Sequence, residues 1–371
     1  MSTAVITVNA GSNSLRLDLV EVTDGREPQV HDSHHTGSSP TGEESLGAFD
    51  SFIDRHGADA ACLGHRLVHG GELIQRPREV DENVPAQLRA AEPLAPQHVP
   101  AARQLVERAR DAYPALRQIV CPDTAFHTTM PEQARAEPLP RRWRSQVRRF
   151  GFHGLSYAWA LQRAAKLLDR PAERLNTVIA HLSGGCSVCA VRDGRSVDTT
   201  MGFTPHGGIT MSRRSGDLDP GTLFWLLRNS GESLDEVEQA LGRESGLLGL
   251  SDGLSNDTRD LVAAAERGDA AAGYAIDVFC RRTASGIASM ATNLQTLDAL
   301  VLTGDIGWNQ PEVRSGICER LGLLGIPSRL SGNRDDDGFV GRVDGRPPVI
   351  VIEPREELQM AIECHRALVG R

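Results

Sequence analysis

The sequence lacks the features that would place the protein in a membrane or on a nucleic acid. No run of apolar residues approaches the roughly 18–20 that a transmembrane helix needs. The opening Met-Ser-Thr leads directly into a strand-like run, without a basic region or cleavage site, so no signal peptide is expected. Acidic residues outnumber basic ones by 49 to 40, a formal net charge of −9, which argues against nucleic acid and anionic membranes as partners.

The cysteines lack the pattern of a disulfide framework or a metal site. Their number is odd, seven, and their spacing is irregular, which favours a reducing, cytoplasmic location. Cys186 and Cys189 form a single CxxC, which could mark redox chemistry or half of a zinc site. They lie in a strand-like run, where residues three apart point to opposite faces, and no second CxxC or close histidine pair completes a ligand set. A structural role is therefore the favoured interpretation.

The common phosphate loops that open a helix are also missing, since neither G-x-x-x-x-G-K-[ST] nor a strand-linked G-x-G-x-x-G occurs. The 371 residues suffice for two ordinary domains or one large one. Their 40% hydrophobic and 24% charged residues predict a packed core rather than disorder.

What is present begins with the stretch VNAGSNSLRLDL, residues 8–19. The apolar run 4–8 ends in Asn-Ala-Gly-Ser-Asn-Ser, after which Leu15, Leu17 and Leu19 alternate with polar residues as in a half-buried strand. The pattern predicts a hairpin whose turn carries small residues with free N–H and hydroxyl donors. Such a turn is either a plain connection or a phosphate-binding site.

A second stretch repeats this pattern. Residues 177–194 again read as apolar strand, small-residue turn and apolar strand, so a duplicated architecture is expected. Helices are expected from Pro100 onward, from a cap at Ser156, and over 270–296, with a buried strand inside 297–307. Residues 24–46, rich in Ser, His, Gly and charge, are interpreted as a surface loop. Strands that alternate with helices predict an α/β fold.

Charged and polar residues able to carry chemistry are scattered over Gly- or Pro-marked loops, where rigid folds usually place sites. Each of them alone would more often be structural. The set consists of Arg66 and His69, His98, Asp123 and His127, His153, and Arg213 and Arg214.

Taken with their surroundings, these residues resemble the acetate kinase family over nearly the whole chain. The matching stretches, in order, are VNAGSNSLR (8–16), GHRLVHGGE (64–72), LAPQHVP (94–100), DTAFHTTMP (123–131), FGFHGLS (150–156), DTTMGFTP (198–205), RSGDLDP (214–220), SGLLGLS (245–251), DALVLTG (298–304) and EEL (356–358). The resemblance implies the duplicated actin–hexokinase–Hsp70 fold, with the active site in the interdomain cleft. Residues 1–148 with 358–371 would form the acceptor and phosphate domain, and 149–357 the nucleotide domain.

The resemblance implies reversible phosphoryl transfer from ATP to acetate or a related short carboxylate, which gives an acyl phosphate and ADP. The resemblance implies that the first hairpin turn binds phosphate through Ser12 and Ser14, and that Arg16 takes the place of a nucleotide-contacting lysine. It also implies that Asn9 and Glu356 bind Mg²⁺ or Mn²⁺. The matching catalytic residues are Arg66, Asp123, His153 and Arg214. Because a carboxylic acid is already ionised at neutral pH, we expect Asp123 to orient Arg66 or the metal's water shell rather than to act as a base.

The nucleotide site departs from the family pattern at two turns. Where the family reads His-Leu-Gly-Asn-Gly, this chain has His181, Leu182, Ser183, Gly184 and Gly185; where it reads Gly-Gly-Ile-Gly-Glu-Asn, the chain has Gly304, Asp305, Ile306, Gly307, Trp308 and Asn309. The resemblance adds Asp257, Thr258 and Arg259 to this site. Trp308 could stack on adenine or block it, and Asp305 beside a phosphate would repel it. The loops either still bind ATP or take another donor, such as pyrophosphate or a different nucleotide.

The acceptor site departs as well. The implied apolar pocket keeps Val68, Phe152 and Pro205, with His98 beside it, but Gln97 stands where the family has Leu. A buried amide needs a partner, so either a protein group or water satisfies Gln97 or the acceptor carries a polar substituent. A nucleotide- or acyl-phosphate-binding protein that has lost catalysis is the alternative of another class, and the full catalytic set argues against it. By resemblance, the protein is expected to be a homodimer.

Overall fold

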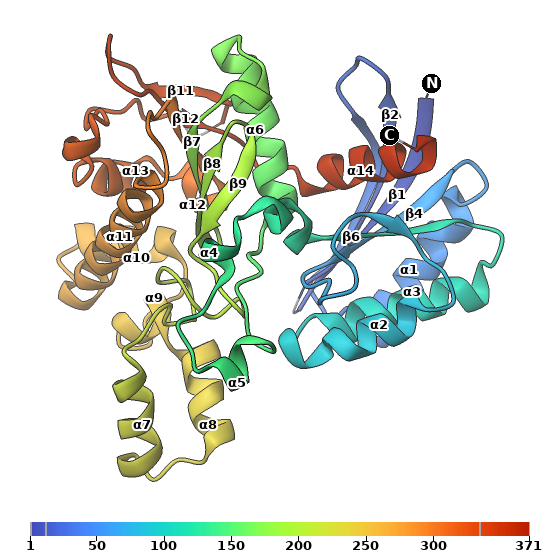
Figure 1. Ribbon diagram of the computed structural model, residues 1–371, viewed down its shortest axis with the longest axis horizontal. Coiled ribbons are helices and arrows are strands. Elements are labelled where there is room, and N and C mark those ends of the chain that lie inside the picture. The colour runs from blue at the N-terminus through green and yellow to red at the C-terminus, as the bar shows by residue number, and fades with distance from the viewer. Residues whose placement is uncertain (1, 12, 334, 371) are drawn as a thin grey trace. The chain divides into compact units, whose positions relative to one another are not determined.

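The computed structural model describes residues 2–11, 13–333 and 335–370. The chain divides into two compact units that are interleaved in sequence (Figure 1). The first unit comprises residues 1–128, 152–159 and 355–371, and the second comprises 129–151 and 160–354. Among the described residues, no helix is both long enough and apolar enough to cross a membrane.

The first unit is built on a mixed sheet with the strand order β3-β2-β1-β4-β6-β5. Strands β1, β4 and β6 run parallel, β2 and β3 continue as an antiparallel meander, and β5 is antiparallel to β6. The strands are β1 (Ser2–Ala10), β2 (Leu15–Thr23), β3 (Gln29–Thr36), β4 (Cys62–Leu67), β5 (Arg78–Glu79) and β6 (Gln118–Pro122). The helices are α1 (Glu43–His56), α2 (Val84–Ala91), α3 (Val99–Ala112) and α14 (Glu356–Val369), with 3-10 turns η1 (Glu92–Leu94) and η2 (Asp123–Thr129).

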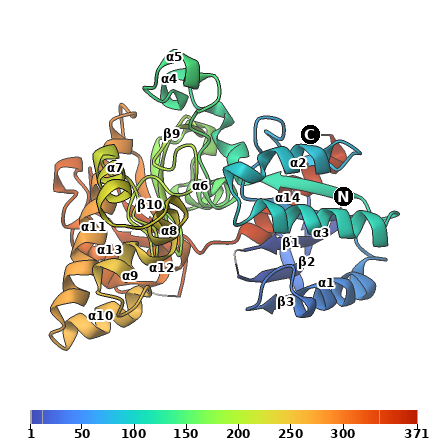
Figure 2. The same cartoon turned by 90° about the horizontal axis from the view of Figure 1, so that it is seen from below.

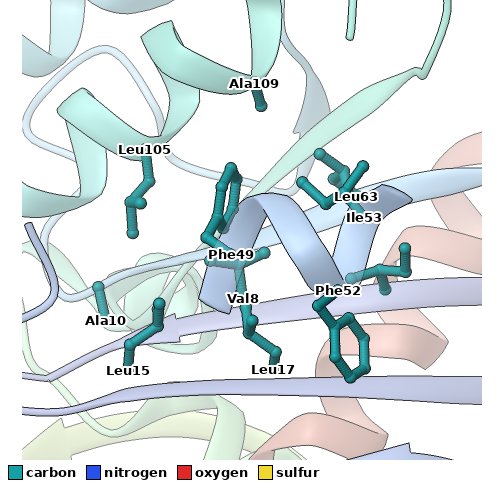
Figure 3. Packing of buried hydrophobic residues seen from close by; sticks show 11 residues of the cluster. Val8, Ala10, Leu15, Leu17, Phe49, Phe52, Ile53, Leu63, Leu105 and Ala109 are labelled. Carbon is teal, nitrogen blue, oxygen red and sulfur yellow. The ribbon is translucent and has the colours of Figure 1, made fainter. Parts of the chain in front are cut away.

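The core of this unit forms where alternate residues of the strands face α1 and α3. Val8, Leu17 and Leu63 pack against Phe49 of α1 and Leu105 of α3, and all five are buried (Figure 3). Side chains alternate between the faces of a strand, so the residues between them point to the opposite face. That face is covered by α14, as Figure 1 shows, where the strands lie between α14 and helices α1 to α3.

The second sheet repeats the first strand for strand, in the order β11-β12-β10-β7-β8-β9. Strands β7, β10 and β12 are parallel, β8 and β9 continue antiparallel from β7, and β11 is antiparallel to β12. These strands are β7 (Thr177–Leu182), β8 (Cys186–Arg192), β9 (Arg195–Thr199), β10 (Ala299–Thr303), β11 (Gly338–Gly341) and β12 (Val349–Val351). The predicted duplication is therefore confirmed.

Figure 2 shows α10, α11 and α13 of the second unit lying side by side. The remaining elements are α4 (Glu132–Arg135), α5 (Arg141–Arg144), α6 (Gly154–Leu168), η3 (Ala172–Arg174), α7 (Pro220–Asn229), α8 (Leu234–Gln239), the π-turn η4 (Ala240–Glu244), α9 (Gly246–Leu250), α10 (Thr258–Glu266), α11 (Ala270–Ala291), α12 (Gly304–Asn309), α13 (Pro311–Cys318) and η5 (Gly322–Leu324). Cys186 and Cys189 are buried free thiols of β8.

Two local expectations are wrong. The expected loop 24–46 contains β3 and the start of α1, because β3 is a largely exposed edge strand whose polar side chains show no alternation and whose pairing comes from β2. Helix α6 begins at Gly154, so Ser156 is a buried residue of its first turn and does not cap it.

Candidate active site

The first part of the site lies where the three parallel strands of the first sheet end. Asn9 lies near the end of β1, Arg66 near the end of β4, and Asp123 directly after β6. The guanidinium of Arg66 donates to Asp123 Oδ2 from Nη2 at 2.7 Å and from Nε at 3.2 Å, and its Nη1 donates to Asn9 Oδ1 at 3.1 Å. The carboxyl ends of parallel strands meet at one edge of a sheet, which is why residues distant in sequence converge here.

Asp123 is fixed from a second side by the start of α6. A Cβ atom on Gly154 would lie 2.0 Å from the carbonyl oxygen of Asp123, so only glycine allows this approach. Burial raises the pKa of the Asp123 carboxyl, while the Arg66 guanidinium and the backbone N–H of Leu155 oppose the rise. Burial disfavours the charge on Arg66, but the carboxylates of Asp123 and Glu356 outweigh it and raise the pKa of Arg66 above its ordinary value. Arg66 is thus a fixed cation.

Glu356 opens α14 on the same face of the sheet. Its carboxylate is half-buried and close enough to act electrostatically on both Arg66 and Asp123. No group of three or more His, Cys, Asp or Glu side chains able to hold a metal ion occurs in the described part of the chain. The carboxylate of Glu356 and the amide oxygen of Asn9 are hard oxygen donors. Such a pair suits Mg²⁺ when substrate phosphates and water complete the coordination shell of the ion.

A backbone hydrogen bond joins the two sides of the first hairpin next to its turn. The N–H of Gly11 donates to the carbonyl oxygen of Ser14 at 2.8 Å, and Ser14 is half-buried. Ser12, named above as a phosphate donor, lies outside the described residues. Arg16 is held by two carboxylates, with Nε 3.1 Å from Asp18 and Nη2 3.3 Å from Glu357.

His153 adopts a backbone conformation that side chains rarely take. Its φ angle is 61°, in the left-handed region, between Gly151 at 79° and the helix start at Gly154. Strained residues of this kind persist where the surrounding structure fixes them, and they cluster at functional sites. Phe152 is fully buried beside His69, with ring centroids 5.4 Å apart, and its carbonyl oxygen accepts a hydrogen bond from His127 Nε2 at 2.9 Å.

The other residues of this unit that are expected at the acceptor lie on or beside one apolar cluster. Val68 packs against a buried cluster to which Ala95 and Val99 belong, and these two residues bracket Gln97. Gln97 is half-buried, and its amide makes no hydrogen bond to any part of the chain that the structure describes. His98 is the residue that precedes α3.

The second unit supplies Arg214 and Pro205, which are in contact. Nη1 of Arg214 donates to the carbonyl oxygen of Pro205 at 3.1 Å. Within the described residues Arg214 has no carboxylate partner, so burial lowers the pKa of its guanidinium from the ordinary value. An arginine remains protonated after such a shift. A partly buried cation without a counter-ion is suited to bind an anion.

The residues expected at the nucleotide converge at the carboxyl ends of β7 and β10. Gly304 has a φ angle of 78°, and a Cβ atom there would lie 2.4 Å from the carbonyl oxygen of Leu182. This close approach puts the turn 183–185 against the start of α12. The hydroxyl of Ser183 donates to Asp305 Oδ2 at 2.8 Å, so two of the departures from the family pattern are in direct contact. His181 and Leu182 are buried residues of β7, and Ile306 is buried in α12.

Thr258 and Arg259 are the first residues of α10, and Asp257 caps the helix. Asp257 accepts from the backbone N–H of Arg259 at 2.8 Å and from its guanidinium, and the buried hydroxyl of Thr258 donates to Gln310 at 2.6 Å. Gln310 lies between α12 and α13, so this bond ties α10 to the end of α12, the helix formed by Gly304–Asn309.

Sequence reasoning missed Arg314, which is completely buried in α13. Its guanidinium donates to the carbonyl oxygens of Gly307, at 3.3 Å, and of Trp308 and Asn333. These bonds fix the C-terminal end of α12, which carries Trp308. The indole nitrogen of Trp308 is buried with no hydrogen-bond partner in the described part of the chain. An arginine between the apolar residues Val313 and Ile317 was the available signal.

The chain is similar to known proteins over most of its length. The model of the acetokinase family matches residues 43–362. The chain belongs to the acetokinase family. The acetate kinase of Deinococcus deserti is 41% identical over 374 residues, which cover 99% of this chain and 89% of that protein. The acetate kinase of Deinococcus radiodurans is 41% identical over 99% of this chain and 98% of its own.

Solved structures agree. A propionate kinase from Francisella tularensis aligns with a TM-score of 0.86 at 31% identity, over 97% of this chain and 98% of that one. The acetate kinase of Porphyromonas gingivalis aligns with a TM-score of 0.86 at 27% identity, over 99% and 100%. The predicted family, the duplicated fold and an ATP-dependent kinase with a carboxyl group as acceptor are thereby confirmed. A donor other than ATP and a protein without catalysis are not favoured.

Proposed function

We propose that the protein transfers the γ-phosphoryl group of ATP reversibly to acetate or a related short carboxylate. The observation that carries the proposal is Arg66, a fixed cation held by the buried Asp123 carboxylate at the ends of parallel strands. In this proposal the first unit binds the acceptor, through Val68, Gln97, His98 and Phe152, and the second unit binds the nucleotide. All seven cysteines are buried free thiols, which supports a cytoplasmic location.

The reaction itself needs little proton chemistry. A carboxylate oxygen of the acceptor forms a bond to the γ-phosphorus while the bond to the β,γ-bridging oxygen breaks, and ADP leaves with that electron pair. Charge spreads over the equatorial oxygens of the moving group, so positioning and neutralisation carry most of the catalysis. Arg66 and Arg214 supply fixed cations for that charge, and His153 donates to it. Asp123 orients Arg66 and removes no proton, since the acceptor is already ionised.

Asn9 and Glu356 would hold Mg²⁺ or Mn²⁺ together with phosphate oxygens and water. When bound, the ion neutralises phosphate charge and fixes the orientation of the polyphosphate. Arg66 contributes by donating to Asn9 Oδ1, which holds that amide with its oxygen in a defined place.

The proposal is tested by trapping the acyl phosphate as a hydroxamate, with ATP and a panel of short acids. We expect turnover with acetate, propionate or a polar relative of similar size, and a loss of about 10²–10³ in kcat for Arg66→Ala. The control is Arg117→Ala, which removes an exposed guanidinium paired with Glu79 in the same unit. Absence of hydroxamate with every acid, from a folded protein, would refute the proposal.

We also propose a homodimer formed through α7. None of its residues is buried, and Phe224 and Trp225 are 53% and 62% exposed. Leu218, just before α7, and Leu234, the first residue of α8 (Leu234–Gln239), are exposed as well, and Figure 1 shows α7 and α8 as a helical hairpin. Exposed apolar side chains that gather on a surface commonly mark interfaces. Trp225→Glu should convert a dimer to a monomer in sedimentation velocity, whereas Leu323→Glu, at another exposed site, should not.

A further inference from the structure

One contact at the proposed nucleotide site is specific to this chain. Strands β7 and β10 are parallel neighbours, paired from Thr177 with Ala299 to His181 with Thr303. The turn 183–185 follows the first strand and Asp305 follows the second, so the topology brings them together. Their side chains meet in the 2.8 Å hydrogen bond from the Ser183 hydroxyl to Asp305 Oδ2.

The chemistry of this contact opposes the binding of phosphate. A hydroxyl has a single hydrogen to donate, and here it is given to a carboxylate. A phosphate oxygen at the turn would compete for that hydrogen and would also be repelled by the negative charge of Asp305. The side chain of Asp305 is exposed.

The nearby cation does not cancel this charge. Arg259 lies within electrostatic reach of Asp305, but its guanidinium forms two close contacts with Asp257, from Nε at 3.0 Å and from Nη2 at 2.5 Å. Three carboxylates, Asp257, Asp260 and Asp305, act on this one guanidinium, whose side chain is 72% exposed. Around Arg259, three carboxylates therefore face one guanidinium.

We propose that Asp305, held at the phosphate turn by Ser183, is an internal anion that competes with the phosphates of the donor and weakens nucleotide binding. It selects for a nucleotide whose phosphate charge is offset by a divalent cation, because free nucleotide meets the full repulsion. The inference rests on the proposed function only in taking the turn 183–185 as part of the nucleotide site.

The test is calorimetric binding of ADP to Asp305→Asn, with and without Mg²⁺, which needs no catalysis. A unit charge about 5 Å from a phosphate, in an effective dielectric between those of protein and water, corresponds to roughly 5- to 30-fold in Kd. We expect Asp305→Asn to tighten ADP binding by about that factor without Mg²⁺, by less with Mg²⁺, and by less at high salt. Asp344→Asn removes an equal charge from an exposed loop of the same unit and should leave Kd unchanged.

Ser183→Ala tests whether the two residues act together. Alone it should leave ADP binding equal to or weaker than that of the unchanged protein, because the charge stays and the hydroxyl is lost. In the double variant the gain from Asp305→Asn should shrink, because no hydroxyl is released to the phosphate. Unchanged or weaker ADP binding in Asp305→Asn would overturn the inference.

The binding assay separates this inference from the proposed function. If no acid yields a hydroxamate but Asp305→Asn still binds ADP more tightly than the unchanged protein, the competition stands and the proposed reaction falls. If the unchanged protein is an active kinase and the Kd of Asp305→Asn is unchanged, the reaction stands and the competition falls.

Discussion

Replacing Asp123 with Asn separates positioning from proton transfer in the active site. The change keeps the shape of the side chain but removes a carboxylate that is 1% exposed and lies 2.7 Å from Nη2 of Arg66. It also places an amide N–H₂ group against guanidinium donors. Breaking a buried ion pair by removing one partner costs about 3–5 kcal/mol. Because Arg66 is 15% exposed and keeps its bond to Asn9, we expect the lower end, about 3 kcal/mol of unfolding free energy.

The loss of kcat in Asp123→Asn should be larger than the loss of folded protein can explain. Without Asp123, the guanidinium of Arg66 is held only by its bond to Asn9, and the loss of one preorganised interaction typically lowers kcat by about 10²–10³. The double variant with Arg66→Ala should be no slower than Arg66→Ala alone, because both changes remove the same interaction. Folded protein is quantified by urea denaturation and turnover by hydroxamate formation.

Two results would contradict this reasoning. A kcat of Asp123→Asn within twofold of the unchanged protein would show that Arg66 needs no orienting carboxylate. Loss of the acidic limb of the pH–rate profile, in the activity that remains, would instead make Asp123 a base. Glu79→Gln is the matched control, since it removes one partner of an exposed pair with Arg117 and should cost less than about 1 kcal/mol.

Four further predictions follow from other residues. Arg214→Ala should lower kcat by about 10²–10³ while changing the Kd for ADP much less, and equal losses in both would assign it to donor binding only. Glu356→Gln, like excess EDTA, should abolish most turnover, and full activity in EDTA would exclude the proposed metal site. Gln97→Leu should raise kcat/KM for acetate or propionate and lower it for hydroxylated or amide-bearing acids, and an unchanged ranking would make Gln97 a loop residue. Burial raises the pKa of Glu363 from 4.5 to about 7. Between these two pH values, the folded state therefore keeps a proton on Glu363 that the unfolded state has released. The free energy of unfolding should therefore fall by about 3 kcal/mol as the pH rises from about 4.5 to about 7, and urea titrations of Glu363→Gln should lack that slope.

Local pattern was enough to predict much of the fold and to select the candidate site residues. The alternation in residues 15–19 predicted β2, because burial of one face of a strand makes every second residue apolar. The apolar run before Gly304 predicted β10, because both faces of that strand are buried. The repeated strand–turn–strand pattern predicted the duplication. The motifs around Arg66, Asp123 and His153 identified the family, since each joins a reactive side chain to the glycines or prolines that shape its loop.

Pairing across the chain was decided by the tertiary structure alone. Arg66 and Asp123 are 57 residues apart and Ser183 and Asp305 are 122 apart, and they meet only because parallel strands that are distant in sequence become neighbours in a sheet. Strand β3 escaped prediction because its hydrogen bonds come from β2 rather than from a pattern of its own burial. The hydrogen bond between Ser183 and Asp305 escaped prediction for the same reason. Sequence pattern records what each residue prefers locally, whereas a hydrogen bond or charge depends on which partner the folded chain brings within reach.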